Sequence, residues 1–98
     1  MMDFFKNMFG EKVNIRELMS NGAVLIDVRS KEEYKMGHNR NSINIPLDKL
    51  PSSLKKLDKS KPIITCCASG ARSATARNYL KNNGFENVYN GGSWRSLN

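Results

Sequence analysis

Short apolar runs alternate with mixed polar segments along the 98-residue chain. The runs at 23–26 and 63–66 are continuously apolar or β-branched, which is typical of strands that are covered on both faces of a parallel sheet. Shorter runs predict further strands at 12–13, 43–45 and 88–89. Strands that alternate with helices predict an α/β fold, with ligands at the carboxyl ends of the parallel strands.

The segments between these runs carry helix signals. Ser30, followed three residues later by Glu33, is a capping-box pair of the kind that opens a helix. Pro51 is tolerated only near the first turn of a helix. The predicted helices cover 14–19, 30–36, 48–57 and 72–82. We therefore expect a central parallel sheet of about four to five strands, flanked by helices on both faces.

Chain length and composition predict one globular domain with a modest core, since 39% of the residues are hydrophobic and 26% are charged. We assign this domain to residues 11–98 and treat residues 1–10 as an N-terminal segment or tail. Its apolar residues recur at helical spacing: Met1, Phe4, Phe5, Met8 and Phe9. The segment is too short and broken for a signal peptide or a membrane span. It is interpreted as a helix packed on the domain, a stripe that binds a partner, or a weak membrane-surface anchor. Membrane contact is not expected, because only one basic residue in the segment supports it.

The net charge of +7 suits the attraction of small anions. Nucleic-acid binding is not expected, because the lysines are scattered and no recognised motif accompanies them. Two adjacent cysteines cannot form a disulfide framework, and no residues stand at metal-ligand spacing around them. These features predict a cytoplasmic protein with reduced thiols and with neither a metal nor an organic cofactor.

The most informative segment is Cys67 and the small-residue loop that follows it. Ala68, Ser69, Gly70 and Ala71 allow the chain to curl so that successive N–H groups converge as an anion-binding nest. The positive end of the next predicted helix faces the same point. Both effects favour the thiolate that a nucleophilic cysteine requires, at the mouth of the sheet. The competing interpretation is a buried structural cysteine before an ordinary strand-to-helix turn.

Six motifs between residues 13 and 94 resemble, in content and order, those of the rhodanese (thiosulfate sulfurtransferase) superfamily, specifically its small single-domain members. They are Asp27-Val28-Arg29, Glu33-Tyr34, Gly37-His38, Asn44-Ile45-Pro46, Cys67-x-x-Gly70-x-Arg72-Ser73, and Gly91-Gly92 with Trp94. The resemblance implies a rhodanese-like α/β fold and a sulfurtransferase activity.

That resemblance implies a chemistry for Cys67. It attacks the outer sulfur of a donor such as thiosulfate, carries that sulfur as a persulfide, and passes it to a thiol or cyanide acceptor. The predicted anion-binding loop comprises Ala68, Ser69, Gly70, Ala71, Arg72 and Ser73. Related sulfurtransferases often have an arginine directly after the nucleophile, where this chain has Ala68, so thiosulfate is expected to be a poor donor.

Two residues at the end of this loop each have two interpretations. Arg72 binds the oxyanion of the donor, as the resemblance implies, or pairs with a carboxylate. Ser73 donates its hydroxyl into the loop or, as we expect, satisfies backbone amides at the helix start. After the strand at 23–26, we predict an ion pair between Arg29 and Glu33 that locks the turn.

Other prominent residues are predicted to be structural. Cys66 should point into the core beneath the loop, because neighbouring side chains on a strand alternate faces. His38 is the only histidine, but a preformed thiolate needs no base. Gly91 and Gly92 are expected to allow close backbone approach, and Trp94 to be a core or rim aromatic.

Three rival functions remain. Cysteine-loop phosphatases place a longer loop between nucleophile and arginine, whereas four residues separate Cys67 from Arg72 here, and no obvious general-acid aspartate accompanies them. A persulfide carrier or interaction module that delivers sulfur to a protein partner would have the same sequence features. An inactive interaction domain is disfavoured because such modules commonly lack the cysteine.

Overall fold

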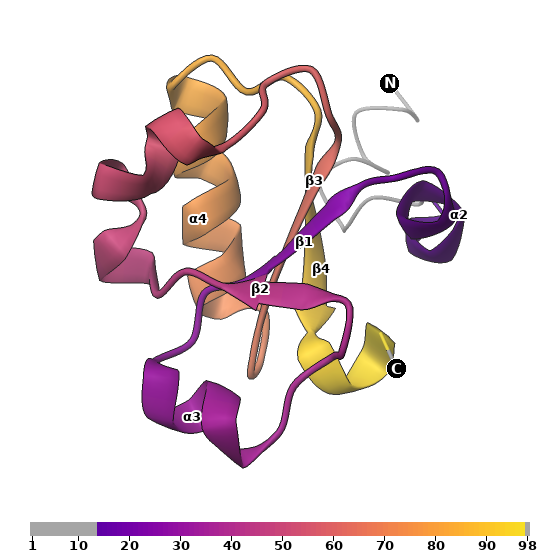
Figure 1. Cartoon of the computed structure of the whole chain (residues 1–98), viewed down its shortest axis with the longest axis vertical. Coiled ribbons are helices and arrows are strands. Elements are labelled where there is room, and N and C mark those ends of the chain that lie inside the picture. Colours follow the sequence, from indigo (N-terminus) through magenta and orange to yellow (C-terminus); the bar gives the residue numbers. More distant parts are fainter. Residues whose placement is uncertain (1–13, 98) are drawn as a thin grey trace, which may run out of the picture.

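The computed structural model describes residues 14–97, which form a four-stranded parallel sheet with helices on both of its faces (Figure 1). The order across the sheet is β2-β1-β3-β4. The strands are β1 (Val24–Asp27), β2 (Ser42–Asn44), β3 (Ile63–Cys67) and β4 (Val88–Ser93). The predicted α/β fold is confirmed. The N-terminal segment 1–10 and the strand predicted at 12–13 lie outside the described residues.

Short helices and turns connect the strands. They are α2 (Ile15–Ser20), α3 (Lys31–Met36), α4 (Ala71–Asn82) and the 3-10 turns η1 (Leu47–Lys49), η2 (Pro51–Lys56) and η3 (Trp94–Leu97). The capping box of α3 is confirmed, because the Ser30 hydroxyl and the Glu33 carboxylate each accept the other residue's backbone N–H. The helix predicted over 48–57 is present as two 3-10 turns, η1 and η2, and not as one continuous helix. Pro51 begins η2, and its missing N–H prevents one continuous helix from running through both turns.

Strand β4 is longer than predicted and carries the irregularity that shapes the site. Thr65 of β3 pairs with Asn90, but Cys67 pairs with Ser93, so the register shifts between them. A Cβ on Gly91 would lie 2.8 Å from a β3 side chain and 3.1 Å from the Thr65 carbonyl oxygen. The predicted close approach at Gly91 is confirmed. The extension brings residues 90–93 alongside the end of β3.

Two apolar layers cover the sheet, one on each face. Side chains of β1 and β3 alternate between them: Ile26 and Ile63 pack on the side of α4, and Leu25 on the side of α2 and η3. This alternation explains why both central strands are apolar throughout. Cys67 lies in the layer under α4 and Cys66 in the layer under α2, as the strand alternation predicts.

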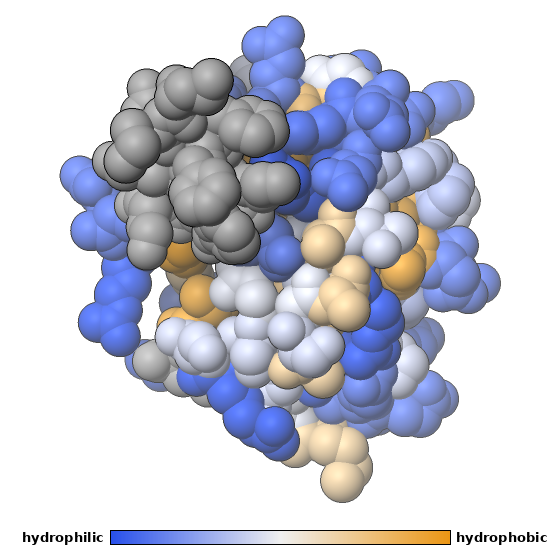
Figure 2. All heavy atoms as spheres, turned by 180° about the vertical axis from the view of Figure 1, so that it is seen from behind, coloured by the Kyte–Doolittle hydropathy of each residue, from blue (hydrophilic) through white to orange (hydrophobic). Residues whose placement is uncertain are grey.

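Hydrophilic side chains dominate the face shown in Figure 2, where the hydrophobic surface of the described residues forms small separate patches. Met36 and Ile43 are the large hydrophobic residues that are exposed within 14–97. No helix in that part of the chain is long and apolar enough to cross a membrane. The same residues contain no cluster of three or more side chains suited to hold a metal ion.

Candidate active site

Cys67 ends β3, and the chain then turns through residues 68–70 into α4 (Figure 1). Gly70 has a φ of +104°, a left-handed conformation that glycine adopts without steric cost. A Cβ on Gly70 would lie 3.4 Å from the Cα of Gly92 in β4. The carboxyl end of a parallel strand and the amino end of the longest helix described therefore meet at this sulfur.

Backbone amides of the loop converge on the Cys67 sulfur. The Gly70 N–H donates to Sγ at 3.0 Å and the Ser73 N–H at 3.4 Å. Burial raises the pKa of the Cys67 thiol, but hydrogen bonding with Ser73 and with the amides of Gly70 and Ser69 outweighs it. The net result is a pKa below that of an ordinary cysteine. The arrangement favours the thiolate, as the loop sequence predicts.

The Cys67 side chain is more enclosed than its place at the mouth of the sheet suggests. The residue has 0% of its surface exposed and packs within the apolar layer under α4. Ala68 and Ser69, which follow it, are exposed. A reactant can therefore contact Sγ only when the exposed part of the loop shifts.

Arg72 forms a bidentate ion pair with Glu33 of α3. Its two terminal nitrogens lie 2.6 and 3.0 Å from the carboxylate oxygens. The pairing with Arg72, followed by the hydrogen bond from the Ser30 N–H, lowers the pKa of Glu33 to about 2. The structure agrees with the second interpretation of Arg72, in which it pairs with a carboxylate. This pair joins α3 to the loop end of α4.

The ion pair predicted between Arg29 and Glu33 is wrong. Arg29 binds Asp27, with Nε and a terminal nitrogen 2.9 and 2.8 Å from its two carboxylate oxygens. Arg29 also donates to the backbone carbonyls of Glu33 and Gly37, and its guanidinium lies 4.7 Å from the ring centre of Trp94. Asp27 and Arg29 are both buried, whereas the Glu33 carboxylate pairs with Arg72 of α4.

The prediction that Ser73 satisfies amides at the helix start is also wrong. Its hydroxyl donates to Asn90 Oδ1 at 2.6 Å and lies 3.4 Å from Cys67 Sγ. Asn90, which sequence reasoning did not single out, contacts the loop again through the Gly70 carbonyl. The available signal was a polar amide directly after the strand-forming pair at 88–89 and directly before Gly91.

Cys66 and His38 have contacts that are typical of structural residues. Burial, and secondarily the Asp27 carboxylate, raises the pKa of the Cys66 thiol to about 12, so Cys66 stays protonated at neutral pH. His38 stacks on Tyr34 with ring centres 3.7 Å apart, and its Nδ1 lies 2.7 Å from the Tyr34 carbonyl oxygen. Neither side chain forms a hydrogen bond to Cys67 Sγ.

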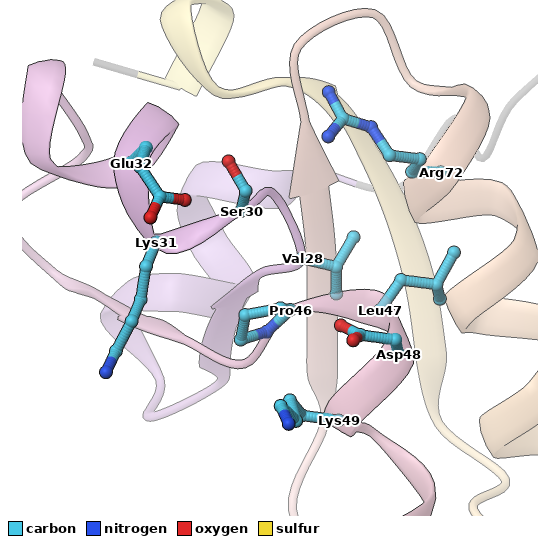
Figure 3. Close-up of a pocket in the computed structure, with 9 residues that line it drawn as sticks. All are labelled: Val28, Ser30, Lys31, Glu32, Pro46, Leu47, Asp48, Lys49 and Arg72. Carbon is cyan, nitrogen blue, oxygen red and sulfur yellow. The ribbon is translucent and has the colours of Figure 1, made fainter.

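A groove of about 620 Å³ borders the loop on the side of α3. Val28, Pro46 and Leu47 give it an apolar centre (Figure 3). Arg72 reaches it from the start of α4, with its guanidinium directed toward α3 (Figure 3). The other lining residues are Ser30, Lys31, Glu32, Asp48 and Lys49. Sequence reasoning did not anticipate this groove, which assembles from three separate segments.

The family model of the rhodanese-like domain matches residues 12–95. A tRNA uridine(34) hydroxylase of Erwinia tasmaniensis is 40% identical over 73 residues, which cover 68% of this chain and 21% of that protein. The chain thus spans about a fifth of the length of that curated relative. The similarity accordingly concerns one part of a larger enzyme.

Two solved structures illustrate the likeness of fold. The reduced CoADR-RHD of Bacillus anthracis superposes with a TM-score of 0.75 at 37% identity, covering 85% of this chain and 15% of that one. A human single-domain sulfurtransferase superposes with a TM-score of 0.71 at 28% identity, and the alignment covers 85% of this chain and 88% of that protein. The fold of this chain therefore occurs both as part of a larger protein and as a complete small one.

Proposed function

This chain belongs to the rhodanese-like domain family, and we propose that it transfers sulfane sulfur from a thiosulfate-like donor to a thiophilic acceptor through a persulfide on Cys67. The observation that carries the proposal is the convergence of the Gly70 and Ser73 amides on Cys67 Sγ. Preorganised amide donors favour a negatively charged sulfur over a neutral one.

The reaction needs two displacements at sulfur. The Cys67 thiolate attacks the outer sulfur of thiosulfate, an Sγ–S bond forms, and the S–S bond of the donor breaks as sulfite leaves with the electron pair. The acceptor, a thiolate or cyanide, then attacks the outer sulfur of the persulfide, and Sγ leaves as the thiolate. We expect the amides that stabilise the thiolate to stabilise the anionic persulfide as well. We expect this chemistry in the cytoplasm, where Cys67 stays reduced.

The groove beside Arg72 is the proposed approach for the donor. The positive side chains of Arg72, Lys31 and Lys49 outnumber the carboxylates of Glu32 and Asp48 around its apolar centre, which suits a small sulfur anion. Because Cys67 has no exposed surface, the donor reaches Sγ together with a shift of the exposed loop residues. We expect that shift to contribute to a modest rate of loading.

Mass spectrometry of the protein after treatment with thiosulfate tests the proposal. We expect the mass of one added sulfur atom on the peptide that contains Cys67, and its loss when a small thiol or cyanide is added. Repeated turnover without another protein supports an enzyme, whereas a single loading that small acceptors cannot discharge supports a persulfide carrier for a protein partner. Failure to load, combined with hydrolysis of an aryl phosphate, would favour the cysteine-loop phosphatase instead.

Arg72→Ala is expected to raise the donor KM roughly tenfold with little change in kcat, because it removes a charge-assisted hydrogen-bond donor from the proposed anion site. Glu33→Gln is the matched variant, since it keeps an oxygen acceptor for the Ser30 N–H while releasing Arg72 from its ion pair. We expect Glu33→Gln to lower the KM. Steady-state kinetics with thiosulfate measures both values, and an unchanged KM in both variants would identify Arg72 as purely structural.

A further inference from the structure

The Asn90 side chain connects β4 to the loop that encloses Cys67. Its side-chain NH2 donates to the Gly70 carbonyl oxygen at 3.2 Å, and its Oδ1 accepts from the Gly92 N–H at 3.0 Å. Turning the amide over would place two donors together at Gly92 and two acceptors together at Gly70. The backbone on both sides therefore determines which way the Asn90 amide points.

This orientation determines what the Ser73 hydroxyl can do. Ser73 Oγ lies 2.6 Å from Asn90 Oδ1, an atom that carries no hydrogen, so the hydroxyl donates its single hydrogen to Asn90. Its lone pairs remain for Cys67 Sγ, 3.4 Å away, and accept from the neutral thiol. The same hydroxyl favours the thiolate only if its hydrogen turns from Asn90 to the sulfur.

We propose that Asn90 is a positioning residue for the nucleophile. Its side-chain oxygen competes with the Cys67 thiolate for the hydrogen of the Ser73 hydroxyl, so that only the loop amides donate hydrogen bonds to the ionised sulfur. Ser73 and Cys67 are both fully buried, so no bulk water replaces the hydrogen bond that is withheld. A thiolate with fewer hydrogen bonds is the more basic and the stronger nucleophile. The significance for sulfur transfer rests on the proposed function, but the competition for one hydrogen does not.

The titratable groups near Cys67 differ from the neutral Asn90 amide in their effect. Arg72 of α4 interacts electrostatically with Cys67, and its charge is shared with Glu33. Cys66 is adjacent on β3 but points to the opposite face, where Asp27 of β1 is its neighbour. Tyr89 is the titratable residue of strand β4, and the β1 side chains in the layer of Cys67 are apolar. None of these groups shares the Ser73 hydrogen in the described part of the chain.

The test is the pH dependence of Cys67 alkylation by iodoacetamide, measured in a Cys66→Ala background so that one thiol reports. We expect Asn90→Ala to lower the apparent pKa of Cys67 by about one unit, because the freed Ser73 hydroxyl then donates to the thiolate. In the double variant Asn90→Ala/Ser73→Ala, that decrease should be absent. Ser73→Ala alone should change the pKa little, since its hydrogen already belongs to Asn90.

A purely structural role of Asn90 predicts a change of opposite sign in the pKa of Cys67. If Asn90 only holds the loop in place, Asn90→Ala would misalign the amides and raise the pKa of Cys67, equally with and without Ser73. Ser73→Ala provides a second test if Asn90→Ala does not fold. An increase of about one unit in the pKa of Cys67 in Ser73→Ala would show that the hydroxyl already donates to the thiolate, and would overturn the proposal. Circular dichroism and Tm establish folding of each variant. Alkylation requires no sulfur transfer, so a failure to form persulfide would overturn the proposed function and leave this result standing.

Discussion

Cys67→Ser is expected to abolish sulfur transfer, with a decrease of at least about a thousandfold in kcat/KM, while the fold remains intact. A serine hydroxyl is almost entirely protonated at neutral pH, and it cannot form the Sγ–S bond that carries the transferred sulfur. The substitution conserves shape at a fully buried position, and the Gly70 and Ser73 amides can donate to the serine oxygen. Thiocyanate production from thiosulfate and cyanide measures the loss, and circular dichroism checks the fold.

Cys66→Ala is the matched control, because it removes the neighbouring thiol and leaves the nucleophile in place. Cys66 lies in the layer under α2, and the raised pKa of its thiol, about 12, leaves it unreactive. We expect Cys66→Ala to retain transfer and sulfur loading. Transfer that survives Cys67→Ser, or that is lost only with Cys66→Ala, would overturn the assignment of the nucleophile.

The largest expected effect on stability is that of Asp27→Asn, at roughly 3–5 kcal/mol in the free energy of unfolding. Asp27 and Arg29 have side chains that are 0% and 5% exposed, and their carboxylate and guanidinium meet at 2.8 Å. The asparagine keeps the size of the side chain but removes its charge, so the buried Arg29 guanidinium loses its counter-ion. Urea denaturation followed by circular dichroism gives the difference.

Asp48→Asn serves as the control for Asp27→Asn, because Asp48 is an exposed residue of η1. The same chemical change there should alter the free energy of unfolding by less than about 0.5 kcal/mol. A cost below about 1 kcal/mol for Asp27→Asn would mean that the carbonyls of Glu33 and Gly37 suffice for Arg29. The pair would then not be the main support of the turn after β1.

Features that depend on residues close together in the chain were predictable. Ser30 and Glu33 are three residues apart and form the capping box that their pattern indicates. The β-branched run at 63–66 forms β3, and the small residues after it curl as expected, with Gly70 in the left-handed region. In each case the stabilising contact lies within a few residues, so the sequence pattern contains both partners.

Predictions failed where a choice among partners depended on packing. Arg29 has three carboxylates within four residues of it in sequence, and burial of its side chain placed it on Asp27 rather than Glu33. The Glu33 carboxylate binds Arg72, which is 39 residues away along the chain. The two turns in place of a helix at 48–57 likewise reflect the position of Pro51 within a connection that must pack against α4.

The order of apolar and polar residues by itself determined the parallel α/β sheet, the turn that follows β3 and the thiol at the start of that turn. Tertiary structure alone decided that this thiol is enclosed, that Arg72 is paired, and that Asn90 lies beside Ser73. The physical reason is that backbone conformation follows from steric and hydrogen-bonding preferences of neighbouring residues, whereas the partner of a long polar side chain depends on which elements are packed together. Asn90 lies beside the loop because β4 pairs with β3 and places Asn90 opposite Thr65, and nothing local to Asn90 specifies that pairing.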